Sequence, residues 1–505
     1  MYTLGWDQIF NAQVLLMLLA GTVAGIVVGI LPGLGPTLGI AVLTPFTFGM
    51  DLTASLALLL GMMCGGTYGG SVSAILCSIP GTTVAMMTTM DGYPMAKLGK
   101  ANKAIGVATI SSFAGGVLGA VILSAAAPAI ARAALKFSAP EYFAIALFGI
   151  SIIAYISPGN MAKGMISGFL GLLLGCVGAD PLTSYGRFMY GHMNLISGVG
   201  YFPILIGLFG MAEVLRSAQR HDEGEVAVIK QSGRVLPTLK EFIGTVPTVI
   251  RSTIIGTFIG AIPAAGGSIA TIVAYGVEKR ISKDPDSFGK GNPLGVAAPE
   301  TANNACASGA MIPLLTLGIP GDPATAVLIG TFLIHGLTLG PMLFKNRPAD
   351  VSAIFILLLL STFLFTIIGI TCAKPLGKII NVKLEILMPI VGLLCCVGAF
   401  AVNNTTFDFI FLLACALVGF VFSKGGVPPA PLVLGIVLGS IIESNFRRSL
   451  MLTKGNLWAI FTRPIAGTFV VLTILMLALP SIIAILSRWS SKIKTMEETR
   501  SNLED

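Results

Sequence analysis

Proline and glycine interrupt apolar segments of this chain at four places that form two matched pairs. The break at residues 32–37 aligns without a gap to the break at residues 263–268, and the Ile-Pro-Gly triplet in residues 78–82 is matched by the one in residues 318–322. Inside a membrane, Pro and Gly free backbone N–H and C=O groups, which must then find other partners. A helix N-terminus can bind an anion, and unwound carbonyls can bind Na⁺. Matched breaks in two halves of a chain are typical of the binding site of a secondary transporter.

The breaks supply backbone groups and hydroxyls that could hold a charged substrate. A single Pro or Gly would be uninformative, because both residues are common in membrane helices. The matched positions favour a functional site, with the hydroxyl of Thr83 as a further candidate. The predicted substrate-binding residues at the breaks are Pro32, Gly33, Gly35, Thr37, Thr82, Pro263, Gly266, Gly267, Ser268, Pro320 and Gly321.

Two stretches of small and polar residues precede the Ile-Pro-Gly triplets. Residues 65–70 hold four glycines, which makes a poor helix interior, and residues 299–309 are the counterpart in the second half. Both stretches place oxygens and amides next to an apolar run, although helix packing through small residues is an alternative explanation. The candidates for substrate are Tyr68, Ser71 and Asn304, and those for a cation are Thr67, Ser73, Asn303 and Ser308.

Two carboxylates, Glu300 and Asp322, are the acids closest to these elements, and we predict both as cation ligands. Ionisable residues at membrane depth are functional candidates by default. Neither acid is mirrored in the first half, where Leu60 and Thr82 occupy the matching positions. Glu300 could instead cap the start of its helix, and Asp322 could be a turn residue. For a third acid, Asp91, we expect a role in ending a segment and fixing a turn before the basic run that follows.

The composition predicts an all-α polytopic membrane protein. Of 505 residues, 54% are hydrophobic and 11% charged, and the mean hydropathy is +0.89. Apolar runs recur along the chain, whereas the alternating strands of a membrane barrel are absent, so we expect about 12 transmembrane helices plus re-entrant or broken helices. The runs at residues 36–49 and 265–277 are short for a crossing. With the runs before them, they form either re-entrant hairpins or two halves of a broken helix.

The chain divides into two halves that we expect to be structural repeats. The first half covers residues 1–216, a polar connecting loop covers 217–243, the second half covers 244–486, and a mixed-charge tail covers 487–505. Lys and Arg cluster in short loops, which explains the net charge of +8 by the positive-inside rule and argues against nucleic-acid binding. Equivalent loops of the two halves differ in basic residues, a pattern that favours an inverted repeat.

No constellation of catalytic or metal-binding residues is visible in the sequence. The eight cysteines all lie in apolar segments, and the three histidines are scattered without ligand spacing. A P-loop motif and a nucleophile–base arrangement are both absent. We therefore expect no enzyme activity, no disulfide, no cofactor and no bound metal beyond Na⁺. The N-terminus does not resemble a removable signal peptide.

Five motifs together resemble the large membrane subunit of the tripartite tricarboxylate transporter family. They lie at residues 30–37, 68–71, 79–94, 299–304 and 317–321, and the resemblance covers residues 1–486. It implies an elevator-type secondary transporter with two repeats, which is multi-pass in the bacterial inner membrane. It also implies two partners, a small four-helix membrane subunit and a periplasmic solute-binding protein, and it places substrate and Na⁺ at the motif positions. Whether the chain forms a homodimer is left open by the sequence.

The function implied by this resemblance is cation-coupled import of citrate or related carboxylates. Moving a trianion against a negative-inside potential of 100 mV requires about 7 kcal/mol, which co-transported Na⁺ would offset. Two alternatives remain at this stage. A permease of an ATP-driven importer would need a coupling loop for an ATPase, and a channel would need a continuous pore.

Overall fold

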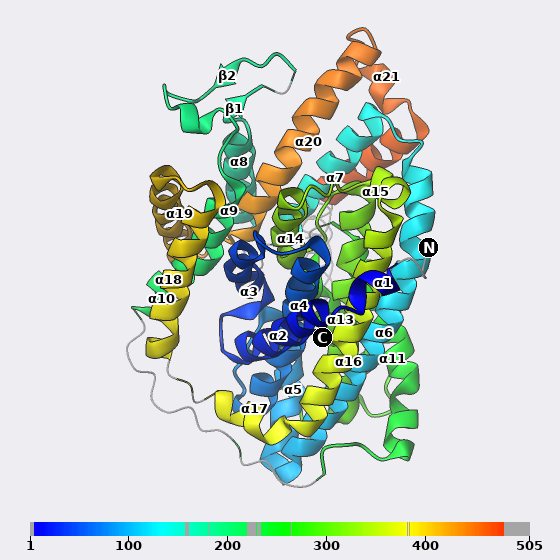
Figure 1. Cartoon of the computed structure of the whole chain (residues 1–505). Helices are drawn as coiled ribbons and strands as arrows, with labels where there is room; N and C mark the ends of the chain where they lie inside the picture. Colours follow the sequence, from blue (N-terminus) through cyan, green and yellow to red (C-terminus); the bar gives the residue numbers. More distant parts are fainter. Residues whose placement is uncertain are drawn as a thin grey trace, which may run out of the picture.

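The computed structural model describes residues 5–156, 161–180, 182–219, 229, 234–263, 265–380, 382 and 384–478. Almost all of this part of the chain is helical (Figure 1). The longer helices are α2 (Ala12–Ile30), α3 (Gly35–Leu43), α4 (Leu52–Cys77), α5 (Met86–Met95), α6 (Ala101–Ala134), α7 (Ala139–Ile156), α8 (Met161–Gly175), α11 (Leu239–Ala261), α12 (Gly266–Ile281), α13 (Pro293–Leu317), α14 (Pro323–Ile334), α16 (Pro348–Thr371), α18 (Leu384–Asn403), α19 (Thr406–Lys424) and α20 (Ala430–Leu452). The shorter ones are α1 (Trp6–Ile9), α9 (Tyr201–Leu205), α10 (Ala212–Ser217), α15 (Pro341–Asn346), α17 (Ala373–Ile379) and α21 (Trp458–Phe461).

The described part of the chain also contains an apolar helix at Pro464–Ala478, short 3-10 and π segments, and one pair of two-residue strands. The 3-10 segments are η1 (Thr44–Thr47), η2 (Thr83–Ala85), η4 (Met193–Leu195) and η6 (Pro285–Ser287), and the π segments are η3 (Ala96–Lys100) and η5 (Ile206–Met211). Strands β1 (Gly178–Ala179) and β2 (Gly186–Arg187) pair antiparallel. The predicted tail 487–505 and about half of the predicted loop 217–243 lie outside the described residues, and α11 begins inside that loop.

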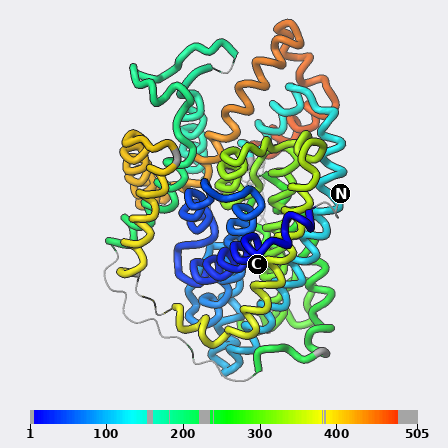
Figure 2. Tube along the Cα trace, viewed as in Figure 1, coloured from blue at the N-terminus to red at the C-terminus, as the bar shows by residue number. Residues whose placement is uncertain are grey.

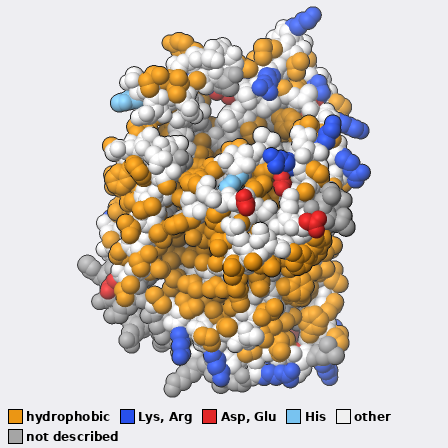
Figure 3. All heavy atoms as spheres, in the orientation of Figure 1, with side chains coloured by type: hydrophobic (Ala, Val, Ile, Leu, Met, Phe, Trp, Pro, Cys, Tyr) orange, Lys and Arg blue, Asp and Glu red, His pale blue; other side chains and the backbone are white. Residues whose placement is uncertain are grey.

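Seven helical segments in the described residues are long and apolar enough to cross a membrane. Five shorter apolar helices accompany them. The predicted number of about 12 crossings would be reached if all five also crossed the membrane. Figure 3 shows hydrophobic side chains gathered across the middle of one face, with Lys and Arg mostly toward its two ends. This is the distribution expected of a protein surrounded by lipid. The prediction of a polytopic helical membrane protein is confirmed.

The N-terminal helices α2, α3 and α4 lie in the middle of the molecule (Figures 1 and 2). Helix α4 is buried along nearly its whole length, and its neighbours include α2, α3, α6 and α16. Helix α13 is buried to a similar degree and packs against α6, α11 and α12. The stretches rich in small residues therefore form the two central helices, which fits the expectation that small residues let membrane helices approach closely.

The two Pro-Gly breaks follow the same backbone course. Leu31 and Ile262 end the preceding helices in extended conformations, with φ −78° and ψ 121° in the first and φ −81° and ψ 119° in the second. Gly35 and Gly266 then begin the next helices at φ +54° and φ +70°, a region that favours glycine. In the second half, α11 and α12 pack against each other as a hairpin, and Arg251 of α11 forms a 2.8 Å ion pair with Glu278 of α12.

Close backbone contacts also recur in matching positions of the two halves. A Cβ atom on Gly29 of α2 would lie 3.0 Å from the Cα atom of Gly66 on α4. At the aligned position of α11, a Cβ atom on Gly260 would lie 3.0 Å from the backbone nitrogen of Ala310 on α13 and 3.1 Å from the carbonyl carbon of Cys306. Helices α2 and α4, and likewise α11 and α13, are therefore packed backbone to backbone.

We expect Gly260→Ala to destabilise the protein by about 1–3 kcal/mol, because the added methyl group overpacks a contact with backbone atoms that cannot move alone. Thermal unfolding in detergent measures the effect. Gly276→Ala in α12 is the matched control, since no described residue beyond the adjacent turns of its own helix lies within 4 Å of the methyl group that it adds. Equal melting temperatures for the two variants would contradict the packing described here.

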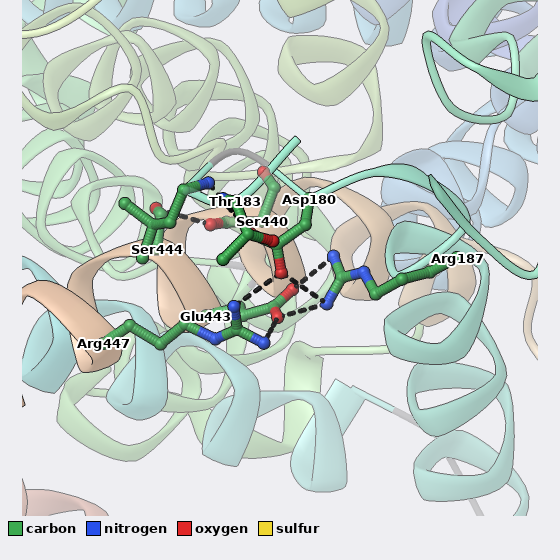
Figure 4. Close-up of polar contacts among 8 residues, drawn as sticks. Asp180, Thr183, Arg187, Ser440, Glu443, Ser444 and Arg447 are labelled. Atoms are coloured by element: carbon green, nitrogen blue, oxygen red, sulfur yellow. Dashed lines mark hydrogen bonds and ion pairs between the residues drawn. The ribbon is translucent and has the colours of Figure 1, made fainter. Parts of the chain in front are cut away.

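Four charged side chains fasten the β1–β2 hairpin to α20 at one end of the molecule (Figure 4). Arg187 contacts both carboxylate oxygens of Glu443, at 2.5 and 3.1 Å. Arg447 contacts Asp180 at 2.5 Å and Glu443 at 3.0 Å. Hydrogen bonds from the backbone N–H groups of Leu182 and Thr183 hold the pKa of Asp180 well below its usual range, and Arg447 lowers this pKa further. The network is charge-balanced and joins residues far apart in the chain.

We expect Arg187→Gln to loosen the hairpin, because it removes the two-pronged contact with Glu443. Backbone amides of residues 178–187 should exchange with solvent about fivefold faster, corresponding to about 1 kcal/mol for a partly exposed ion pair. Hydrogen exchange followed by mass spectrometry measures this. Arg132→Gln is the control, since Arg132 is exposed and donates to the carbonyl of Pro128 in its own helix. An unchanged exchange rate would mean that the network does not hold the hairpin.

Candidate substrate and ion site

The first-half break after α4 meets the second-half hairpin at the start of α12. Ser268 Oγ donates to Thr83 Oγ1 at 3.4 Å. A Cβ atom on Gly267 would lie 2.8 Å from the side chain of Val84, which follows Thr83 in η2. Thr83 is exposed and Ser268 is half-buried, so the two hydroxyls lie at the edge of the packed interior.

Asn303 of α13 lies beside Gly267 at this meeting point. Its amide nitrogen donates to the carbonyl oxygen of Thr67 on α4 at 3.3 Å. Its amide oxygen lies 3.4 Å from a Cβ atom built on Gly267. Both Asn303 and Thr67 are buried. The structure thus brings five predicted residues from both halves together, and we refer to them as the tip cluster: Thr67, Thr83, Gly267, Ser268 and Asn303.

The two breaks of the first half also pack on each other. The backbone nitrogen of Gly33 donates to the carbonyl of Gly81 at 3.2 Å, and the nitrogen of Gly81 donates to the carbonyl of Gly70 at 3.4 Å. Thr82 is buried against Gly70, and its hydroxyl has no hydrogen-bond partner among the described residues. Ser73 donates to the same carbonyl of Gly70 at 3.2 Å. Backbone groups freed by the Pro-Gly breaks are therefore partly satisfied by each other.

Glu300 does not cap its helix. Asn292 is the N-cap of α13, where its side chain accepts from the nitrogen of Leu294 at 2.9 Å. Glu300 lies two turns further along and is completely buried. Its carboxylate accepts hydrogen bonds from Thr88 of α5 and, at 2.9 Å, from Ser112 of α6. The capping alternative for this residue is therefore wrong.

Asp322 is the N-cap of α14. Its carboxylate accepts from the nitrogen of Thr325 at 2.7 Å, and the Thr325 hydroxyl accepts from the Asp322 nitrogen at 2.9 Å. The matching residue of the first half, Thr82, makes no such cap. The carboxylate of Asp322 is engaged at the end of a helix, which agrees with its interpretation as a turn residue and leaves its role as a cation ligand a prediction.

Several predicted residues lie away from the tip cluster. Tyr68 stacks on Phe365 of α16, with ring centroids 5.1 Å apart, and its hydroxyl lies 2.8 Å from that of Thr109 on α6. Ser308 faces α6, where its Cβ lies 3.2 Å from a Cβ atom built on Gly119. The others contact various neighbours: Gly33 faces Glu213 and Arg216 of α10, Pro263 faces Gly149 of α7, Gly321 packs on Ala310 and Gly260, Gly35 faces the Thr82 methyl group, and Asn304 donates to the Glu300 carbonyl.

The remaining predicted residues are parts of the breaks themselves. Pro32 follows the end of α2 and is half-buried, Thr37 lies half-buried in the first turn of α3, Gly266 begins α12, and Pro320 is buried ahead of α14. Ser71 is buried on α4.

Comparison with known proteins decides the family. Residues 15–434 match the family model described as the tripartite tricarboxylate transporter TctA family. The chain belongs to the tripartite tricarboxylate transporter TctA family. It is similar to an uncharacterized 52.8 kDa protein in the TAR-I ttuC' 3' region of Agrobacterium vitis, with 37% identity over 429 residues that make up 85% of each chain. An uncharacterized protein in the TAR-II ttuC' 3' region of the same organism is 34% identical over 230 residues, 45% of this chain and 95% of the relative. No solved structure matches.

Family membership confirms the resemblance and the broad function. A TctA-family protein is a multi-pass membrane component of a tripartite tricarboxylate transporter and not an enzyme. The family also implies other subunits, such as a binding protein and a small membrane subunit. The tip cluster and Glu300 both lie within residues 15–434, which the family model matches.

Sequence analysis missed two polar residues of this TctA-family protein and gave a third the wrong role. Thr88 and Ser112 contact Glu300, but each has a second hydroxyl residue beside it in the sequence, Thr89 and Ser111, so the sequence does not mark which hydroxyl faces the acid. Asp91 was predicted to fix a turn after its segment, and this is wrong: it lies inside α5 and is completely buried. A buried acid in an apolar stretch was the available signal.

Asp91 instead holds the distant connection between α12 and α13. Its Oδ1 atom accepts from the backbone nitrogens of Gly289, Gly291 and Asn292 at 2.9, 2.9 and 2.8 Å. Its Oδ2 atom accepts from the hydroxyl of Tyr275 on α12 at 2.9 Å. These bonds fix the start of α13, the helix that carries Asn303 and Glu300.

We expect Asp91→Asn to destabilise the TctA-family protein by about 2–4 kcal/mol. If the new amide turns its oxygen toward the three backbone N–H groups, it no longer accepts from the Tyr275 hydroxyl. In the opposite orientation its NH₂ group faces the three backbone donors. In both orientations the remaining hydrogen bonds are no longer made to a charged group. A lower melting temperature in detergent checks this. Asp51→Asn serves as the control, since Asp51 is exposed and its side chain makes no cap. A melting temperature equal to that of the control variant would show that the bonds to Asp91 do not stabilise the fold.

Proposed function

We propose that this chain is the large membrane subunit of an Na⁺-coupled importer of tricarboxylates such as citrate, or of related carboxylates, in the bacterial inner membrane. A periplasmic solute-binding protein delivers the substrate, and a small four-helix subunit accompanies the chain. The observation that carries the proposal is the meeting of breaks from both halves at the tip cluster. Such a site at a repeat interface is typical of secondary transporters.

The two halves are structural repeats of inverted orientation that move by an elevator-type mechanism. Support comes from the equivalent torsion angles at the two breaks and from the matched close contacts of α2 with α4 and of α11 with α13. The unequal basic loops of the two halves support the inversion. A carrier built this way presents one central site alternately to either side, whereas a channel needs a continuous pore.

A carboxylate substrate binds at the starts of α3 and α12. The first N–H groups of a helix have no partner in their own helix, and the helix dipole favours an anion there. At the start of α12, Ser268 adds a hydroxyl, and Thr83 faces it from the first half. Thr37 adds a hydroxyl in the first turn of α3. These groups bind a multiply charged anion by hydrogen bonds, since the arginine that faces Gly33, Arg216, already forms an ion pair with Glu213.

Coupling to Na⁺ is required by the charge of the substrate. Three negative charges entering a cell at 100 mV, negative inside, need about 7 kcal/mol, at about 2.3 kcal/mol per charge. Two or more Na⁺ ions moving with the substrate reduce the transported charge and add the energy of their own gradient. The direction of transport is therefore inward.

Uptake of radiolabelled citrate into proteoliposomes tests the proposal. The vesicles contain this chain and its small subunit, the binding protein is added outside, and an inward Na⁺ gradient is compared with an equal choline gradient. We expect accumulation only with Na⁺ and the binding protein. Na⁺-driven uptake of another carboxylate would change the substrate and keep the mechanism. Carboxylate uptake that needs no ion gradient would contradict the proposal and favour an ATP-driven permease or a channel.

We expect Ser268→Ala to raise the KM for the carboxylate about tenfold or more, because a hydrogen bond to a charged group is lost. Ser124→Ala is the matched control, since Ser124 is half-buried like Ser268 and donates within its own helix. Initial uptake rates over a range of substrate concentrations give the two KM values. Equal values would place the substrate away from the tip cluster.

A further inference from the structure

Glu300 is a completely buried carboxylate whose hydrogen-bond partners are hydroxyls. Thr88 of α5 donates to one oxygen, and Ser112 of α6 donates to the other at 2.9 Å. None of the ion pairs formed by the described residues includes Glu300. A buried carboxylate without a positive partner is strongly disfavoured. Two hydroxyls do not replace a positive charge.

Another buried carboxylate of the same fold shows the contrast. Glu278 of α12 is buried to a similar degree, and it accepts from Arg251 at 2.8 and 2.9 Å and from Thr248 at 2.9 Å. Its charge is therefore balanced by an arginine. Glu300 has the same kind of hydroxyl partner without the arginine.

Ser71 points to a ligand at the same place. It is completely buried on α4, and its hydroxyl lies beside the Glu300 carboxyl group without a hydrogen bond of normal geometry. An unsatisfied hydroxyl next to an unbalanced carboxylate leaves lone pairs free on both. Oxygen atoms from four helices, α4, α5, α6 and α13, thus surround one point.

We propose that Glu300, Ser71, Thr88 and Ser112 bind the Na⁺ ion that drives transport, an inference that rests on the proposed function. A carboxylate with neutral oxygens is a donor set suited to hard cations. The bound ion balances the carboxylate and accepts the lone pairs of the hydroxyls, which can keep their hydrogen bonds to Glu300. The first half has Leu60 at the matching position, so the repeat supplies this site once.

The ion site lies next to the tip cluster on the same pair of helices. On α13, Asn303 follows Glu300 by three residues, and on α4, Thr67 precedes Ser71 by four, so each pair shares a helix face. An uncompensated Glu300 would repel an anion arriving at the tip cluster, because charges interact strongly in a water-poor interior. Na⁺ therefore binds before the carboxylate and makes its binding favourable.

Na⁺ binding to the purified full chain with its small subunit tests the site apart from transport. The melting temperature is followed in NaCl and in choline chloride of equal ionic strength. We expect NaCl to raise it for the natural protein, and Glu300→Gln to weaken the apparent Na⁺ affinity at least tenfold. Glu278→Gln is the matched control and should keep the natural affinity. An Na⁺ affinity of Glu300→Gln within twofold of the natural value would overturn the proposal.

Ser112→Ala and Ser111→Ala provide a milder pair in case Glu300→Gln does not fold. Ser112 contacts Glu300, whereas its neighbour Ser111 lines a separate pocket with Lys103 and Glu241. Ser112→Ala should weaken Na⁺ affinity severalfold and Ser111→Ala should not. Equal affinities for the two variants would overturn the proposal.

Transport by the same proteins separates this inference from the proposed function. If the natural protein shows no Na⁺-driven uptake, the proposed function fails. If it does, and Glu300→Gln keeps the same Na⁺ dependence as Glu278→Gln, only the ion site is wrong. Uptake driven by a proton gradient without Na⁺ would overturn Na⁺ as the occupant. Loss of Na⁺ dependence in Glu300→Gln alone supports both proposals.

Discussion

Backbone polar groups and charges inside a bilayer must be satisfied by the protein itself or by what it binds. This constraint explains why the breaks in this chain lie against each other rather than against lipid. The backbone nitrogen of Gly33 in one break donates to the carbonyl of Gly81 in the other, and the nitrogen of Gly81 donates to the carbonyl of Gly70 on α4. The hydroxyl of Thr82 has no hydrogen-bond partner among the described residues, which agrees with its predicted role in binding.

The close approach of α2 to α4 and of α11 to α13 makes this arrangement possible. Each pair is joined where glycine leaves room for the neighbouring backbone, as Gly29 does against Gly66. Bulkier residues would separate the helices and leave the tips of the breaks apart. The abundance of glycine is therefore a property of the packing, which in turn positions Ser268 against Thr83.

The sequence predicts the membrane class and the breaks, because both follow from local chemistry: long apolar runs and the backbone limits of Pro and Gly. It does not predict which break meets which, since Asn303 and Thr67 are 236 positions apart in the sequence and are joined only by helix packing. Thr88 and Ser112 escape sequence analysis for a related reason. Many hydroxyls in membrane helices simply bond to their own helix, as Thr109 does to the carbonyl of Ile105, and their sequence context looks the same.

Three of the buried carboxylates, Asp91, Glu278 and Glu300, differ in what balances their charge, and we interpret this difference as one between structure and transport. Asp91 receives three backbone N–H groups and a tyrosine hydroxyl, so its charge is spread over donors that fix a loop. Glu278 has Arg251, which fixes a helical hairpin. Within the described part of the chain, the partners of the Glu300 carboxylate are hydroxyls alone, which orient a carboxylate without balancing it. A permanent cation there would lock the helices, whereas a cation that enters and leaves lets the same four helices exist in two states of charge, and a coupled transporter needs that difference.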